Sequence, residues 1–221
     1  MDYAIQVLTA LDTITRYGLP ITFFISSLAF ITGLLIGVIL VFLHSFGGSI
    51  AEALIGSLVT ILRAIPPVLM LFIVFYGFPF LGISVDRYTA AILGLGFISS
   101  AYQSQILRSS VEAVTARQFE AALSIGLSRW EAYISVIIPQ ALRLSIPGLV
   151  NEFTIVLKDS SLAYAIGVVE VFTKADQIAR ARFDYLAPMT AAAILYFVIC
   201  FTLSRFASYM YRKLRELGYG V

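Results

Sequence analysis

Long apolar stretches dominate the chain and are separated by short polar segments. Four runs of about twenty or more residues carry no Asp, Glu, Lys or Arg, and they begin at Tyr17, Ala64, Tyr88 and Tyr185. A helix needs roughly 20 apolar residues to cross a hydrocarbon core about 30 Å thick. We therefore predict transmembrane helices at residues 19–43, 53–76, 88–108 and 185–205, the second of which starts before its charge-free run.

A fifth apolar stretch is interrupted by polar residues. Residues 136–157 contain Arg143, Asn151 and Glu152, and Lys158 and Asp159 follow immediately. We predict a fifth span here, because polar groups are tolerated inside a membrane where they face protein or a cavity. The pattern therefore predicts an all-α integral membrane protein of about five spans, forming one domain over residues 1–221.

Composition supports a membrane protein and argues against several other classes. Hydrophobic residues make up 60% of the chain and charged residues 13%, whereas soluble domains have about a quarter of their residues charged. One cysteine, Cys200, excludes an internal disulfide framework, and one histidine, His44, argues against a histidine-based metal site or catalytic set. The net charge of +2 is too small to indicate a nucleic-acid surface. We expect no cofactor in this chain.

The distribution of basic residues predicts the orientation. The carboxyl-terminal tail contains Arg205, Arg212, Lys213 and Arg215, whereas the amino-terminal tail has Arg16 and two aspartates. The positive-inside rule therefore places the C-terminus in the cytoplasm and the N-terminus outside. No signal peptide is evident. The apolar residues before Arg16 share one helical face, which predicts a short helix lying on the membrane surface; a poorly ordered tail is the alternative.

The segment 112–135 carries two helix-start signals around a glycine. Thr115 with Gln118, and Ser128 with Glu131, have capping-box spacing. Gly126 between them can adopt the left-handed conformation that ends a helix. We predict a cytoplasmic helix–turn–helix whose first helix starts at Ala116, followed by a break or kink at Pro139. An ordinary solvated loop is the alternative.

This segment resembles the Glu-Ala-Ala loop of ABC-importer permeases. The matching residues are Glu120, Ala121, Ala122, Gly126, Val136, Ile138 and Pro139. The chain looks like a permease of the polar amino-acid uptake family, of the histidine, arginine or glutamine type. Further similarities lie at residues 63–66, 101–102, 151–153 and 157–162.

The resemblance implies a type I ABC importer in the cytoplasmic (inner) cell membrane. Two permease subunits, identical or different, would form the pathway, and an extracytoplasmic binding protein would deliver an amino acid. ATPase subunits would dock on the coupling residues Glu120, Ala121, Ala122, Gly126 and Pro139. The chain lacks a Gly-x-x-x-x-Gly-Lys-Ser/Thr phosphate loop, so ATP and Mg²⁺ are expected on the partner, and this chain is not expected to be an enzyme.

Two other functional classes compete with this interpretation. An ATP-independent secondary transporter or channel is the main alternative, although no inverted repeat is evident in the sequence. A membrane-embedded enzyme is the other, but the chain contains no His-x-x-x-His, Ser–His or paired-aspartate arrangement within its apolar segments.

Five polar residues near the membrane are candidates for contact with the solute: Glu152, Asn151, Arg63, Tyr102 and Asp159. A carboxylate such as Glu152 suits an ammonium group. Its alternative role is an internal salt bridge to Arg63, Arg143 or Lys158. Arg63 has the alternative of satisfying carbonyls freed by the following prolines, and Tyr102 that of simple packing. Asp159, next to Lys158, has the alternative of marking the membrane exit or a local ion pair.

Overall fold

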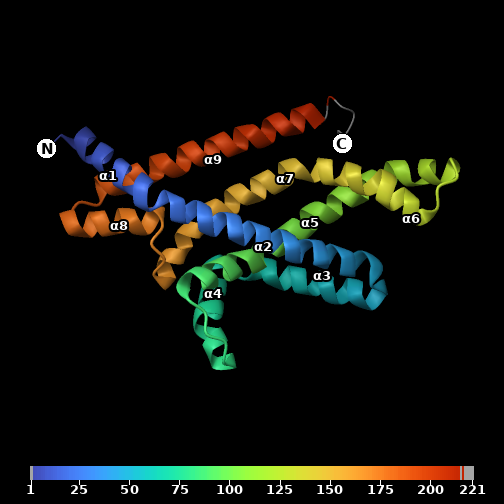
Figure 1. The fold of residues 1–221 in the computed structure, drawn as a ribbon, viewed down its shortest axis with the longest axis horizontal. Coiled ribbons are helices and arrows are strands. Elements are labelled where there is room, and N and C mark those ends of the chain that lie inside the picture. Colours follow the sequence, from blue (N-terminus) through green and yellow to red (C-terminus); the bar gives the residue numbers. More distant parts are fainter. Residues whose placement is uncertain (1, 215, 217–221) are drawn as a thin grey trace.

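The computed structural model describes residues 2–214 and 216 and shows an elongated helical bundle without strands in that part of the chain (Figure 1). Arg215 of the basic tail lies outside the described residues. In chain order the elements are α1 (Tyr3–Tyr17), α2 (Leu19–Phe46), α3 (Gly48–Ala64), α4 (Pro67–Phe72), the π-helix η1 (Ile73–Gly77), the 3₁₀-helix η2 (Phe78–Leu81), α5 (Arg87–Ser124), α6 (Arg129–Glu131), the π-helix η3 (Ala132–Ile137), α7 (Ile138–Asp159), the 3₁₀-helix η4 (Ser160–Ile166), α8 (Val171–Arg182) and α9 (Leu186–Leu214).

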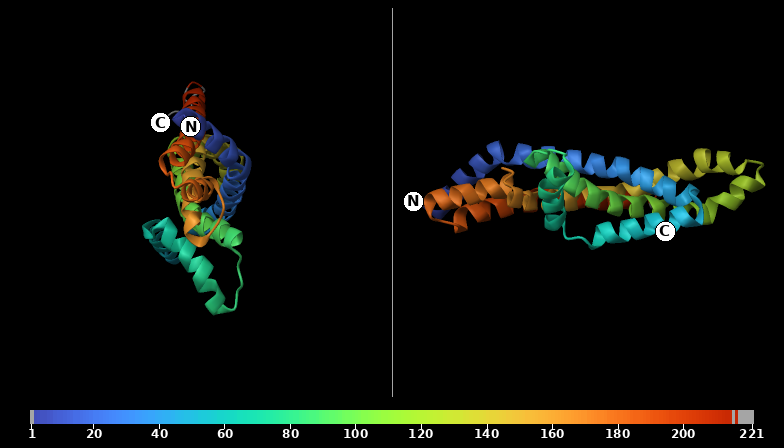
Figure 2. Two further views of the ribbon diagram at one scale, coloured as in Figure 1. Left: turned by 90° about the vertical axis from the view of Figure 1, so that its left-hand side faces the viewer. Right: turned by 90° about the horizontal axis from the view of Figure 1, so that it is seen from below.

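The long axis of the bundle separates two polar ends. The N-terminus and α8 lie at one end, and the turn between α5 and α6 lies at the other (Figures 1 and 2). Helices α2 and α5 pack closely because α2 has glycines where they meet. A Cβ on Gly33 would come within 2.8 Å of the Gln103 side chain, and one on Gly37 within 3.1 Å of the Ser100 carbonyl oxygen. The spacing of these glycines therefore serves packing within the chain.

Four helices among the described residues are long and apolar enough to cross a membrane, and a fifth span results if the bent pair at α3–η2 is counted as one. The four are α2, most of α5, the helical run through α7, and α9. The all-α membrane fold is thus confirmed.

The predicted span at 53–76 is a broken helix. Helix α3 ends at Ala64, and the chain turns by 101° before it continues through α4. Ile65 is extended (φ −77°, ψ 125°), since the ring of a following proline disfavours helical geometry in the residue before it. Pro67 then begins α4, where its missing N–H costs no hydrogen bond.

The predicted helix start at Ala116 is wrong, because α5 continues without interruption to Ser124. The Thr115 hydroxyl donates to the Val111 carbonyl 2.8 Å away, inside the helix. A capping residue must itself have non-helical backbone angles. Thr115 keeps helical angles, because the residues around it are good helix formers.

The second half of the predicted helix–turn–helix is confirmed in detail. Gly126 has a φ of +90°, in the region that favours glycine. The Ser128 backbone N–H donates to Glu131 Oε2 at 2.8 Å, and the Glu131 N–H donates to Ser128 Oγ at 3.3 Å. This reciprocal pair starts the returning helix.

Of the predicted break or kink at Pro139, the break is not seen. Residues 129–166 form one helical run, and the π-helix η3 directly precedes α7, in which Pro139 lies in the first turn. A π-helical turn changes the carbonyl positions ahead of the ring, so a proline can be accommodated. The Gln140 side chain donates to the Val136 carbonyl at 2.9 Å, one turn earlier in the same helical run.

The amino-terminal helix uses its apolar face for packing on protein. Ala10 and Ile14 of α1 are fully buried, in a cluster with Val171 and Ala175 of α8 and Ala191 of α9. The helix itself was predicted, whereas the expected placement of that face on the membrane surface is not what the structure shows.

Candidate functional site

A cavity of about 270 Å³ lies beside the break between α3 and α4. It is bounded by that break, by α5 and by the last turns of α7. Its polar lining consists of Arg63, Ser99, Tyr102, Glu152 and Asp159, and the rest of its wall is apolar. The extended Ile65 positions Arg63 at one edge, because it ends α3 two residues beyond that side chain.

Glu152 is the most buried acid of the cavity, with 3% of its surface exposed. Ser99 of α5 donates its hydroxyl to Glu152 Oε1 at 2.8 Å. Gln103 donates from Nε2 to Ser99 Oγ at 2.9 Å and to the Phe30 carbonyl at 3.0 Å. A chain of hydrogen bonds therefore runs from α2 through α5 to the carboxylate on α7 and sets its orientation.

Two of the three ion pairs considered for Glu152, those with Arg63 and Lys158, are not seen among the described residues. In the described part of the chain no salt bridge joins Glu152 to Arg63 or Lys158, and no hydrogen bond is seen to its second oxygen, Oε2. Leaving a buried carboxylate without a cation costs several kcal/mol. The arrangement therefore suits a cationic ligand that enters the cavity.

Arg63 and Asp159 provide further charges in the same cavity. The Arg63 guanidinium lies 5.0 Å from the centre of the Tyr102 ring, a cation–π contact. Asp159 follows Glu152 by seven residues, two helical turns, and so shares its face of α7. The cavity thus contains two acids and one base, side chains that can hold groups of both signs.

Asn151 does not belong to this cavity. Its side chain is exposed and lines none of the cavity wall, because it is one residue, about 100° of helix, away from Glu152. The sequence interpretation missed Ser99, which holds Glu152. A signal was present, because Ser99 and Gln103 are polar residues four apart and therefore lie on one face of the span.

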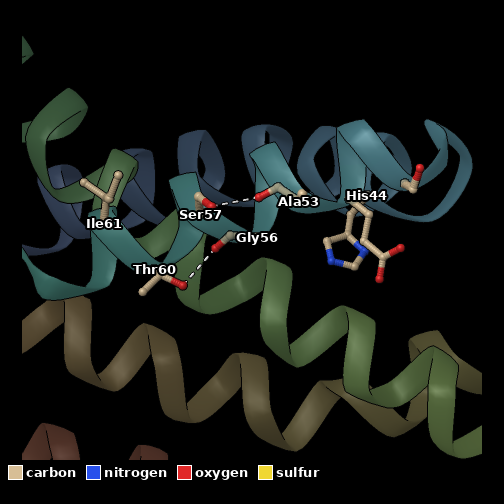
Figure 3. Close-up of a pocket in the computed structure, with 8 residues that line it drawn as sticks. His44, Ala53, Gly56, Ser57, Thr60 and Ile61 are labelled. Carbon is tan, nitrogen blue, oxygen red and sulfur yellow. Dashed lines mark hydrogen bonds between the residues drawn. The ribbon is translucent and has the colours of Figure 1, made fainter.

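A second, shallow hollow of about 660 Å³ extends along α3 (Figure 3). His44 lines it from the end of α2, and the face of α3 contributes small and polar residues. The hydroxyls of Ser57 and Thr60 donate to the Ala53 and Gly56 carbonyls, both at 2.8 Å. Gly56 has no atom of another residue near the place of a Cβ, so this face of α3 is left uncovered by the chain itself.

The predicted coupling residues of the segment 112–135 and Pro139 differ in their exposure. The segment 112–135 is called the coupling loop below. Glu120, Ala121, Gly126 and Pro139 are exposed, whereas Ala122 is buried inside the hairpin, where its carbonyl accepts from the Leu127 N–H at 3.3 Å. The tip of the loop also exposes Ile125 (78%) and Trp130 (62%). An apolar surface of this kind at the end of a helical hairpin is typical of a docking site for another protein.

A third polar cluster lies at the opposite end and is fully paired. Glu170 caps α8, accepting from the Phe172 N–H (2.8 Å) and the Thr173 N–H (2.7 Å), and the Tyr196 hydroxyl donates to it from α9 at 2.8 Å. Burial raises the pKa of this carboxyl above its usual range, and the donors oppose the shift only in part. The cluster ties α8 to α9, so it is structural.

These features together define a class: a helical membrane subunit with a charged cavity beside a broken helix and a protruding loop. Residues 30–216 match the family described as binding-protein-dependent transport system inner membrane component. The chain belongs to this family, and its resemblance to ABC-importer permeases is confirmed.

Individual relatives and solved structures agree with the family. The chain is 34% identical to the glutamine transport system permease protein GlnP of Escherichia coli (strain K12), over 90% of this chain and 92% of that one. It is 33% identical to the probable amino-acid permease protein YxeN of Bacillus subtilis (strain 168), over 87% of each. A crystal structure of an amino acid ABC transporter with histidines superimposes with a TM-score of 0.86 at 29% identity, covering 97% of this chain and 99% of that one.

A more distant structure supports the fold alone. An inward-facing form of the MetNI methionine ABC transporter matches with a TM-score of 0.65 at 19% identity, covering 96% of this chain and 95% of that one.

Proposed function

We propose that this chain is the translocating subunit of an ATP-driven importer for amino acids, with a preference for basic ones. The observation that carries the preference is Glu152, a buried carboxylate that faces a cavity and forms no salt bridge with any described residue. The names of the relatives, which include glutamine and arginine transport system permeases, support an amino acid as the solute.

The charges of the cavity are complementary to a basic amino acid. Such a solute carries two cationic groups and one carboxylate. Glu152 and Asp159 would each pair with one cation, and Arg63 would pair with the carboxylate while it stays over Tyr102. A neutral amino acid leaves one acid uncompensated, which is unfavourable in a site largely removed from water.

Partner subunits complete the proposed importer. A second permease copy or paralogue would cover the open face of α3, so that the hollow of Figure 3 becomes part of an enclosed path below the cavity. A separate ATPase would dock on the coupling loop around Gly126, and an extracytoplasmic binding protein would deliver the solute to the opposite end. The coupling loop and the C-terminus would then face the cytoplasm, and the N-terminus would lie outside.

The test is uptake by the whole complex in proteoliposomes, at fixed levels of ATPase and binding protein. Glu152→Gln keeps the size and the bond from Ser99 but removes the charge. We expect uptake of arginine to fall about tenfold or more, because a hydrogen-bonded ion pair in a buried site contributes on the order of 1.5–3 kcal/mol. Uptake of glutamine should fall less. Asp86→Asn, an exposed acid at the start of α5, is the control.

Two results would contradict the proposal for Glu152. If the variant does not accumulate in the membrane, the carboxylate is structural. If accumulation and arginine uptake both stay at the level of the parent chain, Glu152 faces neither solute nor a buried partner.

A further inference from the structure

A polar hollow and an apolar groove adjoin at the coupling-loop end of the bundle. The hollow, about 390 Å³, is lined by His44, Arg108 and Glu112 among others, and the groove, about 240 Å³, by apolar side chains of α2, α5 and α7. Both are also lined by Ser45, Val111 and Tyr133. They therefore form one amphipathic depression, which is separate from the charged cavity and shares His44 with the α3 hollow.

The position of this depression along the bundle corresponds to one surface of the membrane. Helix α5 begins at Arg87, beside Asp86, and Arg108 follows 21 residues later. At 1.5 Å per residue this places the two arginines about 31 Å apart, close to the thickness of the hydrocarbon core of about 30 Å. Arg108 thus lies at the headgroup level of the leaflet on the coupling-loop side.

The groove opens toward lipid. Val38 and Phe42 of α2 and Leu142 of α7 line it and are 50%, 56% and 53% exposed. In the charge-free part of α2 such exposure indicates contact with acyl chains. The groove leads from this apolar face directly to Arg108, so a molecule with an apolar tail and a polar head fits both halves.

The hollow presents one charge of each sign. Arg108 and Glu112 are one helical turn apart, with 3.7 Å between Nε and Oε1, and their side chains are 34% and 65% exposed. His44 Nε2 and Gln105 Oε1 each lie 3.1 Å from the guanidinium and hold it in place. A phosphate with a primary ammonium two carbons away matches this pair, since guanidinium and carboxylate bind those groups.

We propose that this depression binds a phosphatidylethanolamine molecule of the leaflet on the coupling-loop side. The phosphate lies on Arg108, the ammonium lies on Glu112, and one acyl chain fills the groove. Tyr133 of η3 and Leu142 of α7 form one wall, while α2 and α5 form the other. The lipid therefore holds the coupling loop against the membrane-spanning helices. Its headgroup determines how firmly the loop is held.

The test is native mass spectrometry of the full permease in its purified complex, titrated with dioleoyl phosphatidylethanolamine, phosphatidylglycerol or phosphatidylcholine. We expect phosphatidylethanolamine to bind about threefold more tightly than the other two, the size of one exposed ion pair. Glu112→Gln should remove this preference. Arg108→Gln should weaken all three lipids about tenfold, as expected for loss of a charge-assisted phosphate contact.

A groove variant keeps the test independent of the charged pair, should Arg108→Gln fail to fold. Leu142→Trp fills the groove and should abolish the preference, whereas Val198→Trp, equally exposed on α9 (53%), should leave it unchanged. Equal binding of the three lipids by the parent chain, or a preference that survives both Glu112→Gln and Leu142→Trp, would overturn the proposal. Binding by the isolated permease that is lost in the complex would also overturn it, because a partner protein then covers this face.

Discussion

At the scale of single residues, the buried carboxylates of Glu152 and Glu170 differ in how completely they are hydrogen-bonded. Glu170 has backbone, threonine and tyrosine donors around both oxygens. Glu152 has the Ser99 hydroxyl on one oxygen and an open cavity beside it. A fully paired carboxylate holds elements together, whereas a partly paired one is available to a ligand.

Burial favours the protonated form of Glu170, and the hydrogen bonds donated to its carboxylate oppose that effect only in part. Thr173 Oγ1 lies 2.6 Å from the Val168 carbonyl and 2.8 Å from Glu170 Oε1, and its one proton cannot serve both acceptors fully. A proton on the carboxyl would complete the set. This agrees with the pKa of Glu170 being raised, for which burial is the main cause.

The raised pKa predicts how stability depends on pH. The contribution of Glu170 is fully present below its unfolded pKa of about 4.3 and is lost as the pH rises through its higher folded pKa. Glu170→Gln cannot ionise, so the Tm difference between parent chain and variant should shrink as the pH is raised from about 4.3 to neutral. Thermal unfolding in detergent measures it.

The control for this prediction is Glu52→Gln, which changes an exposed acid on α3. The Tm difference between the parent chain and Glu52→Gln should not shrink in the same way as the pH is raised. A Tm difference for Glu170→Gln that grows with pH would mean that the ionised form is the one stabilised by the fold.

At the scale of elements, the coupling hairpin depends on one rigid helix and one glycine. Helix α5 runs for 38 residues from the far side of the bundle to the loop. One continuous helix therefore connects the cavity with the coupling loop. Gly126 reverses the chain at its end with a φ of +90°. The Ser128–Glu131 capping box then starts the return toward α7.

A β-branched residue at Gly126 should distort this turn. No neighbouring atom would touch an added Cβ at Gly126, so the cost of Gly126→Val is backbone strain, about 1–2 kcal/mol. We expect solute-stimulated ATP hydrolysis by the reconstituted complex to fall several-fold, while the permease still inserts. The readout is phosphate release with and without solute.

Gly48 offers a matched control for Gly126. It also has a positive φ (+74°) and open space where a Cβ would lie, but it belongs to the α2–α3 turn. Gly48→Val imposes the same kind of strain away from the hairpin tip. Equal loss of ATP hydrolysis in the two variants would argue against a specific role for the Gly126 turn in docking.

At the scale of the whole molecule, a single copy leaves one side of the bundle uncovered. The α3 hollow is exposed along its length, and the segment α4–η2 projects away from the bundle (Figure 2). Phe80 and Leu81 at the tip of this segment are 91% and 73% exposed. The chain itself does not cover these surfaces, so either lipid or a second subunit would lie against them.

We therefore predict that the functional unit contains two permease subunits. A twofold or pseudo-twofold pair would cover the α3 face with the same face of its partner. The mass of the complex in detergent should correspond to two permease chains, and cysteines introduced at Ser57 should crosslink in native membranes. Cysteines at Ser208 on α9, an exposed serine with a comparable internal hydrogen bond, should crosslink less.

A stable, active complex with one permease chain and no paralogue would contradict this prediction. Crosslinking at Ser208 but not at Ser57 would place the partner on α9 instead.

The sequence by itself determined the membrane class, the helical spans and the turn of the coupling loop. These follow from local signals: charge-free runs of sufficient length, a glycine where φ must be positive, and a serine and a glutamate three residues apart. Pro66 and Pro67 were a signal for the break in the second span, because they act on the residues next to them, but the prediction was a single span at 53–76.

Only the tertiary structure decided which distant residues meet. Ser99 and Glu152 are 53 residues apart, and their contact depends on how α5 packs against α7. Likewise, Thr115 has a capping pattern but stays helical, and Pro139 is absorbed by the π-helix before it. At Thr115 the continuous helix outweighs a capping preference worth about 1 kcal/mol. At Pro139 the π-helix accommodates a ring that would otherwise cost about 3 kcal/mol. No pattern of neighbouring residues contains that balance.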